Sequence, residues 1–280
     1  MGQRSVESAM ANSLFAIGRR KAEAFDMAFN HFHNYYEIYY LLSGERYYFI
    51  KDRTYHVRKG NLVFINMYDL HKTTTITSTY ERILIDFKKT FLTGFTEHIK
   101  DIDMFACFDR QINIARLNIK QQHSVEGLLF KMIDEFKNRT KGFDTALKVS
   151  LMELLLFLNR YTAAEESEPL EHPSSLHEKV SEIARYINEH YGQHISLKST
   201  AERFFISPYY LSRVYKKITG FTFVEYLNSV RIKEAQRLLR ESALNITQIA
   251  EKTGYESITH FGRVFKDITD CSPLQYRKML

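Results

Sequence analysis

Short apolar runs at regular spacing mark the first part of the chain. EIYYLL, RYYFI, TYHV, LVFI and ERILIDF follow one another between residues 37 and 87, separated by the turn signals SGE, KDR and KGN. Tyr, Phe and β-branched residues dominate these runs. Strands of this length and rhythm predict a sandwich or small barrel rather than a parallel sheet. A further strand at INIARL, residues 112–117, would complete it.

Helical spacing replaces this pattern from about residue 120. Apolar residues recur three and four positions apart at Val125, Leu128, Leu129, Met132, Ile133 and Phe136. A second predicted helix, FDTALKVSLMELLLFLNRY, follows a Lys141-Gly142 break. It holds more leucine than one narrow stripe requires, and two explanations stay open. The surplus is covered either by another protomer or within the same chain.

A polar stretch divides the chain into two predicted domains. AEESEPLEHPSSLH, residues 164–177, loses all periodicity and gathers Glu, Pro and Ser, so we interpret it as a linker. The pattern before it, in 1–163, predicts a β-barrel with two flanking helices. The pattern after it, in 178–280, is helical throughout. The predicted fold class is therefore α+β with two domains.

Helix starts are well marked in the second domain. Ser207-Pro208 and Ser272-Pro273 place a capping residue before a first-turn proline. Thr222 to Glu225 and Asn245 to Gln248 have the spacing of capping boxes. These signals predict several short, capped helices.

The second domain also contains an internal repeat. LSRVYKKITG, residues 211–220, matches FGRVFKDITD, residues 261–270, at an offset of 50 positions. Each copy follows a short helix with an alanine (Ala201, Ala250), a tight connection (Phe205-Ile206, Gly254-Tyr255) and a serine cap (Ser207, Ser257). A short helix, a turn and a longer capped helix form a helix-turn-helix. The pattern occurs twice.

Each longer helix has an apolar face, at Leu211, Val214, Tyr215 and Ile218 in the first copy and at Phe261, Val264, Phe265 and Ile268 in the second. The opposite faces carry side chains able to contact bases and phosphates. An ordinary charged helix face would not account for a matched duplicate. We therefore predict recognition helices at about 208–219 and 258–268 that bind double-stranded DNA. The predicted contact residues are Tyr209, Tyr210, Ser212, Arg213, Lys216, Thr259, His260, Arg263 and Lys266.

Charge supports this prediction. The chain of 280 residues has a formal net charge of +6, and residues 178–280 hold 16 Lys and Arg against 11 Asp and Glu. A basic excess confined to one domain suits a polyanionic partner. Cys107 and Cys271 match neither a metal-binding spacing nor a disulfide framework, which favours a reducing cytosol. The absence of a signal peptide or an apolar span predicts a cytoplasmic protein without a membrane segment.

One motif in the first domain carries candidate metal chemistry. In HFHNYYE, residues 31–37, strand alternation would place His31, His33, Tyr35 and Glu37 on one face. With His71 from a later strand, His31, His33 and Glu37 could hold a divalent metal. The same groups could instead hydrogen-bond an effector. The domain is then a small-molecule sensor, a metalloenzyme, or a dimerisation scaffold.

Sequence motifs in both predicted domains resemble those of a known family. SPYYLSRVYKKITG, RIKEAQRLL and IAEKTGYESITHFGRVFKDITDCSPLQYRK are similar to the DNA-binding domain of the AraC/XylS family of bacterial transcriptional regulators. The resemblance implies seven helices with two helix-turn-helix units joined by a long helix. Asp270 stands where the family usually has glycine. HxHxxxExxxxxxG matches the first cupin motif, whereas Asn66 replaces the usual proline of the second.

The resemblance implies a transcriptional regulator with a cupin-like sensing domain and no catalytic activity. It suggests an activator that forms a homodimer, contacts RNA polymerase and responds to a small-molecule effector, with a sugar as the suggested class. We expect no cofactor and an effector pocket without tightly bound metal. The helix beginning at Thr222, about 27 Å long, would let one monomer occupy successive major grooves. The predicted effector-binding residues are His31, His33, Tyr35, Glu37, Tyr39 and His71.

Overall fold

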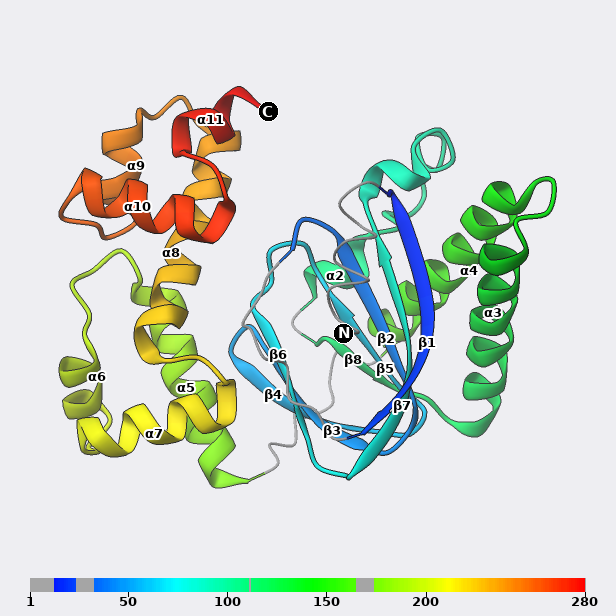
Figure 1. Ribbon diagram of the computed structural model, residues 1–280, viewed down its shortest axis with the longest axis horizontal. Helices are drawn as coiled ribbons and strands as arrows, with labels where there is room; N and C mark the ends of the chain where they lie inside the picture. Colours follow the sequence, from blue (N-terminus) through cyan, green and yellow to red (C-terminus); the bar gives the residue numbers. More distant parts are fainter. Residues whose placement is uncertain (1–12, 24–32, 111, 165–173, 280) are drawn as a thin grey trace. The chain divides into compact units, whose positions relative to one another are not determined.

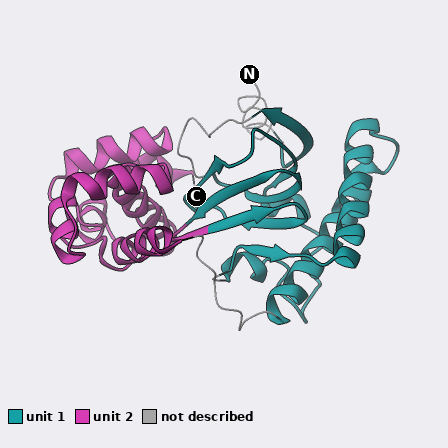
Figure 2. Cartoon of the chain, turned by 90° about the horizontal axis from the view of Figure 1, so that it is seen from below, with its two compact units in different colours: residues 1–50, 55–171 teal, residues 51–54, 172–280 magenta. Residues whose placement is uncertain are grey.

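The structure, a computed structural model, describes residues 13–23, 33–110, 112–164 and 174–279. The chain divides into two compact units, residues 1–50 with 55–171 and residues 51–54 with 172–280 (Figure 2). No helix among the described residues is long and apolar enough to cross a membrane. Each unit has its own core and is described separately.

The N-terminal unit is built on two antiparallel sheets (Figure 1). The larger has the strand order β1-β7-β2-β5-β8 and the smaller the order β4-β3-β6. This confirms the predicted all-β core of the domain. The strands are β1 Phe15–Glu23, β2 Tyr36–Ser43, β3 Glu45–Ile50, β4 Arg53–Arg58, β5 Asn61–Ile65, β6 His71–Thr75, β7 Thr79–Phe87 and β8 Ile114–Arg116.

The side chains of strand β2 point alternately into two different hydrophobic clusters. Tyr36, Ile38 and Tyr40 belong to a cluster shared with the helices. Tyr39 and Leu41 belong to a second cluster, with residues of β3, β4 and β5. Because successive side chains point to opposite faces, β2 supplies one face to the helix layer and the other to the space between the sheets. Glu37 lies in register with the second set.

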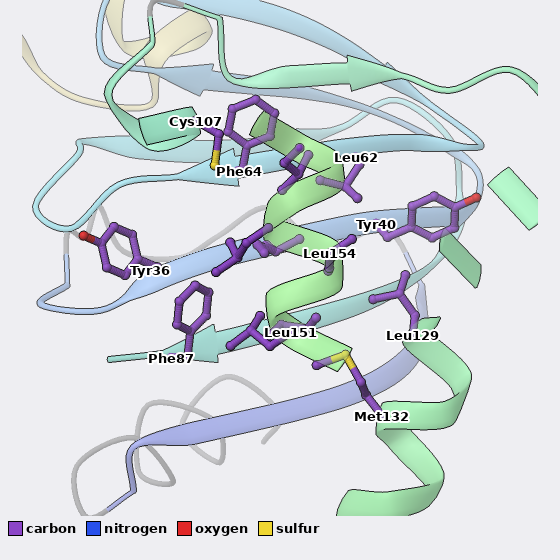
Figure 3. Packing of buried hydrophobic residues seen from close by; sticks show 14 of the residues in the cluster. Tyr36, Tyr40, Leu62, Phe64, Phe87, Cys107, Leu129, Met132, Leu151 and Leu154 are labelled. Atoms are coloured by element: carbon purple, nitrogen blue, oxygen red, sulfur yellow. The ribbon is translucent and has the colours of Figure 1, made fainter. Parts of the chain in front are cut away.

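Two helices, α3 Ile119–Asn138 and α4 Phe143–Ala164, cover the larger sheet, while η1 Lys89–Leu92 and α2 Ala106–Asp109 are short. Figure 3 shows Leu151 and Leu154 of α4 packed over Tyr36, Phe64 and Phe87. Five leucines of α4 are almost fully buried within this one chain, and Leu156 is partly buried. The structure thus supports the intramolecular explanation of the leucine surplus. These residues are Leu147, Leu151, Leu154, Leu155 and Leu158.

The C-terminal unit has seven helices within residues 174–279, as the resemblance implied. Ser174 caps α5, so the last three residues of the predicted linker form the first turn of that helix. The linker residues 165–173 lie outside the described residues. The helices are α5 Ser175–His190, α6 Leu197–Arg203, α7 Pro208–Thr219, α8 Phe223–Glu241, α9 Ile246–Lys252, α10 Ile258–Thr269 and α11 Pro273–Lys278.

Helix α8 joins two similar halves of this unit. It contacts α5 and α7 in one half and α9, α10 and α11 in the other (Figure 1). The capping boxes predicted at Thr222 and Asn245 are both present. The predicted apolar faces of α7 and α10 are buried, except that Ile268 is only partly covered. Local capping and one apolar stripe per helix therefore account for this part of the fold.

Candidate DNA interface and ligand site

The two helix-turn-helix units have the same backbone geometry at their turns. Phe205 and Gly254 both adopt a left-handed conformation, with φ of 56° and 81°. Each follows a short helix and closes it with equivalent hydrogen bonds, the pattern of a Schellman-like C-cap. The matching bonds are Phe205 N to Glu202 O and Ile206 N to Ala201 O in the first unit, and Gly254 N to Glu251 O and Tyr255 N to Ala250 O in the second.

The recognition helices begin and end alike as well. Ser207 accepts a hydrogen bond from Tyr210 N, and Ser257 accepts one from His260 N. The helices α7 and α10 each span 12 residues, and α10 ends one residue later than predicted. At their C-caps Gly220 has φ 80° and Asp270 has φ 59°. Asp270 thus takes the left-handed conformation for which glycine is usual.

Every residue predicted to contact DNA is exposed. Tyr209 is 77% exposed and Tyr210 39%, and Ser212, Arg213, Lys216, Thr259, His260, Arg263 and Lys266 are exposed as well. Their buried neighbours hold the helices, so these side chains are displayed on a fixed frame. Sequence reasoning did not include exposed Lys217, one position beyond Lys216. Helical spacing was the available signal, because Lys217 lies four residues after Arg213 and so on the same face.

The cations on these faces have no acidic partner among the described residues. Arg213, Lys216, Arg263 and Lys266 form none of the ion pairs that the structure contains, whereas Arg237 of α8 pairs with Glu234 and Glu241. Unneutralised cations are available to phosphates and base edges. The second helix also carries Asp267 where the first has Lys217. The first face is therefore the more positive of the two.

A buried polar cluster lies in the N-terminal unit, where His33, Glu37 and His71 come together. His33 Nε2 is 3.4 Å and His71 Nε2 3.8 Å from the same Glu37 oxygen, Oε2. Tyr48 OH donates a 2.9 Å hydrogen bond to the other oxygen, Oε1. His33 is 9% exposed, Glu37 5% and His71 0%. His31 lies outside the described residues.

Hydrogen bonds to backbone carbonyl groups hold the rings of both histidines in place. His33 Nδ1 lies 2.8 Å from the carbonyl oxygen of Tyr35, and His71 Nδ1 lies 2.8 Å from that of Asp69. A carbonyl oxygen only accepts, so each Nδ1 must donate. His33 Nε2 also lies within hydrogen-bonding distance, 3.4 Å, of Glu37 Oε2. Two imidazole rings and a carboxylate thus meet at one point.

A buried carboxylate beside two imidazole rings suits a group that brings positive charge or hydrogen-bond donors. The candidate ligand atoms of His33, Glu37 and His71 all lie within 4.8 Å of one another, so these three residues could hold a divalent metal. An ammonium group or the hydroxyls of an organic effector would satisfy the same acceptors. These three residues could therefore hold either a metal ion or an organic ligand.

Aromatic and cationic side chains surround this cluster. The Tyr35 ring stacks on His33 with centroids 3.8 Å apart, and Tyr39 meets Tyr48 edge-on at 5.1 Å. Burial raises the pKa of Tyr39 to about 12. Burial, followed by the Glu37 charge, holds the pKa of Tyr48 well above its usual range. Tyr48 therefore stays protonated and donates to Glu37.

Sequence reasoning missed two buried members of this surface, Tyr48 and Arg46. Arg46 is 3% exposed, lies over the Tyr80 ring at 4.0 Å and donates a 3.0 Å hydrogen bond to Thr73 Oγ1. Strand alternation places Arg46, Tyr48 and Ile50 on one face of β3. An arginine in the inward register of a strand was the available signal.

A buried polar cluster in a β-domain, joined in one chain to two exposed basic recognition helices, defines a DNA-binding regulator with a ligand-binding domain. Comparison with known families agrees. Residues 15–156 match the AraC-like ligand binding domain, and residues 200–279 match a helix-turn-helix domain. The chain belongs to the AraC/XylS-type helix-turn-helix transcriptional regulators with an N-terminal AraC-like, cupin-like domain. These are transcription regulators, not enzymes.

Similar proteins include regulators of comparable length. The HTH-type transcriptional regulator YfiF of Bacillus subtilis is 27% identical over 256 residues, covering 89% of this chain and 78% of YfiF. The HTH-type transcriptional activator RhaS of Klebsiella pneumoniae is 24% identical over 253 residues, covering 89% of this chain and 87% of RhaS. A crystal structure of ToxT from Vibrio cholerae has a TM-score of 0.42 at 16% identity, covering 96% and 98% of the two chains.

Proposed function

We propose that this regulator activates transcription and places its two recognition helices in successive major grooves on one face of DNA. The observation that carries the proposal is the pair of equivalent exposed faces with unpaired cations, centred on Arg213 and Arg263. Helix α8, with 19 residues, joins them. At 1.5 Å per residue it spans about 28 Å, comparable to the roughly 34 Å between successive major grooves. Similarity to the activator RhaS supports activation.

The DNA contacts are testable with two matched variants. A duplex selected by the full-length protein from a randomised library serves as the probe. Arg213→Ala and Arg263→Ala should each weaken binding by about 1–3 kcal/mol and relax base preference at a different subsite. Arg237→Ala, which removes a cation already paired on α8, is the control and should leave base preference unchanged. Selection of the same sequences by both recognition-helix variants would contradict the proposal.

The second part of the proposal concerns the ligand. A small molecule binds in the N-terminal unit through His31, His33, Tyr35, Glu37, Tyr39 and His71, and changes how the regulator binds DNA or RNA polymerase. The buried Glu37 carboxylate beside His33 and His71 offers hydrogen-bonding groups to a hydroxyl-rich ligand, a class that includes sugars. Binding shifts transcription only if the two states of the protein differ in affinity for the ligand.

Thermal-shift screening of metabolites checks this assignment. A true effector raises the melting temperature of the wild type in proportion to ligand concentration. Glu37→Gln keeps the shape of the side chain but removes its negative charge, so it should abolish the shift. Glu45→Gln, at a half-exposed carboxylate paired with His56, is the control and should preserve it. A shift retained in Glu37→Gln would remove the cluster from the ligand site.

Measurement of bound metal distinguishes a metal site from an effector site at this cluster. We expect protein purified without chelator to carry no tightly bound metal at His33, Glu37 and His71. Elemental analysis that found near-stoichiometric zinc, manganese, nickel or iron, lost in His33→Ala, would make the cluster a metal site instead.

The same preparation tests the proposed homodimer by mass measurement across micromolar concentrations. The dimer proposal rests mainly on the family resemblance, because most α4 leucines are already buried within one chain, although Leu156 is only partly buried.

A further inference from the structure

Phe205 has a backbone conformation for which glycine is the usual residue. Its φ of 56° is uncommon for a bulky residue. The equivalent residue of the second unit, with the same turn hydrogen bonds, is Gly254. Glycine adopts this conformation without strain. A phenylalanine there is therefore not explained by the turn that it helps to form.

The Phe205 side chain does not serve the core either. It is 95% exposed, more than any other large apolar residue among those that the structure describes. It takes part in none of the aromatic or cation-π contacts between described residues. Backbone strain combined with an exposed aromatic ring reduces stability without a packing gain. Such a residue is more readily explained by a partner than by the fold.

The surroundings of Phe205 identify that partner. Phe205 lies two residues before the Ser207 cap of α7, and Tyr209 in the first turn of α7 is also largely exposed. From Arg203 to Val224 the sequence contains four basic residues and no acidic one. This positive charge is complementary to the phosphates of DNA, which the adjoining helix α7 is proposed to bind. The N-terminal residues of a recognition helix are those that face base edges.

We propose that Phe205, with Tyr209, packs against thymine methyl groups in the major groove occupied by α7. The thymine C5-methyl is the apolar group that this groove displays, and aromatic side chains contact it. The second unit, with Gly254 and Thr259 at the equivalent positions, lacks this contact. The two half-sites of the operator therefore differ, and only the first requires thymine at this place. The inference rests on the proposed DNA-binding function.

The test uses the full-length protein and the duplex that it selects from a randomised library. Phe205→Gly makes the first turn like the second, and it should preserve or raise the melting temperature because it removes the strain at positive φ. It should nevertheless weaken binding by about tenfold. Leu274→Ala, at a half-exposed apolar residue of α11, is the control and should bind as the wild type does.

Replacing thymines one at a time by deoxyuridine, which lacks the methyl group, locates the contact. The wild type should lose affinity at one or two positions of the first half-site, and Phe205→Gly should be insensitive there. Equal DNA affinity of the two proteins would overturn the inference. So would a loss of affinity in Phe205→Gly that leaves the sensitivity to deoxyuridine unchanged. Intact DNA binding with lost transcription would also overturn it, and would indicate a protein partner. Failure of the wild type to select any sequence would instead overturn the proposed function.

Discussion

The two helix-turn-helix units share their framework and differ on their outer faces. Both have serine caps, the same turn hydrogen bonds and a recognition helix of equal length. The first displays Phe205 and Tyr209 with an uninterrupted basic face, whereas the second has Gly254, Thr259 and Asp267 at the corresponding places. The framework depends on short-range interactions that both copies retain. If each outer face binds its own DNA subsite, as proposed, the two half-sites are unequal.

We expect the largest effect on stability from Gly254→Phe, which places in the turn of the second helix-turn-helix unit the residue type found in the turn of the first. A Cβ on Gly254 would lie 2.6 Å from Tyr191 O and 2.8 Å from Arg231 Nη2. Gly254→Phe should therefore destabilise the second unit by about 3 kcal/mol, through a backbone clash and strain at positive φ. Hydrogen exchange of the α9 and α10 amides in the full chain measures the loss, with the α7 amides as internal control. Unchanged protection of α10 would contradict the observed close approach.

Charge at the end of the recognition helices should have a smaller effect. Lys217→Asp gives the first helix the charge of the second, and Asp267→Lys does the reverse. The first change should weaken DNA binding and the second should strengthen it, each by about 1 kcal/mol at low salt, because one phosphate contact is lost or gained. The dependence of affinity on salt concentration should become shallower in Lys217→Asp and steeper in Asp267→Lys. Equal slopes for all three proteins would remove these residues from the interface.

The smallest expected effect concerns the C-caps of the two recognition helices. Gly220 ends α7 at φ 80°, whereas Asp270 ends α10 at φ 59°. Asp270→Gly should stabilise the second unit by about 0.5–1 kcal/mol, since glycine has no steric penalty in this conformation. Thermal unfolding of the full chain checks it, with Asp267→Gly as the control expected to lower stability. A lower melting temperature for Asp270→Gly would show that its side chain stabilises the turn.

The sequence was sufficient to predict what depends on neighbouring positions. Capping boxes, the duplicated units and the strands β2, β3, β4, β5 and β7 follow from local spacing, whereas the polar strand β6, HKTTT, is not among the predicted apolar runs. Strand β1 was missed because its sequence, FAIGRRKAE, mixes charges into an edge strand whose pairing with β7 only the fold reveals. What buries the α4 leucines could not be predicted from the sequence either, because periodicity does not show what covers a helix face.

The same distinction holds for the candidate sites. The predicted strand alternation was wrong for His33 and Tyr35, which precede the start of β2 at Tyr36. The structure nevertheless brings His33 and Glu37 together with His71. Tyr48 was not singled out because a tyrosine-rich strand offers no local sign of which hydroxyl meets a carboxylate. Phe205 lies in an apolar segment, FFI, that by pattern alone looks buried. Only the backbone conformation turns its ring outward.

Hydroxyl-radical footprinting of the selected duplex tests the central claim most directly. With the full-length wild type, the account predicts two protected segments on one face of DNA, separated by about one helical turn, roughly 34 Å. Arg213→Ala should lose protection in one segment and Arg263→Ala in the other. A single protected segment, unaffected by Arg213→Ala, would contradict the placement of two recognition helices in successive major grooves.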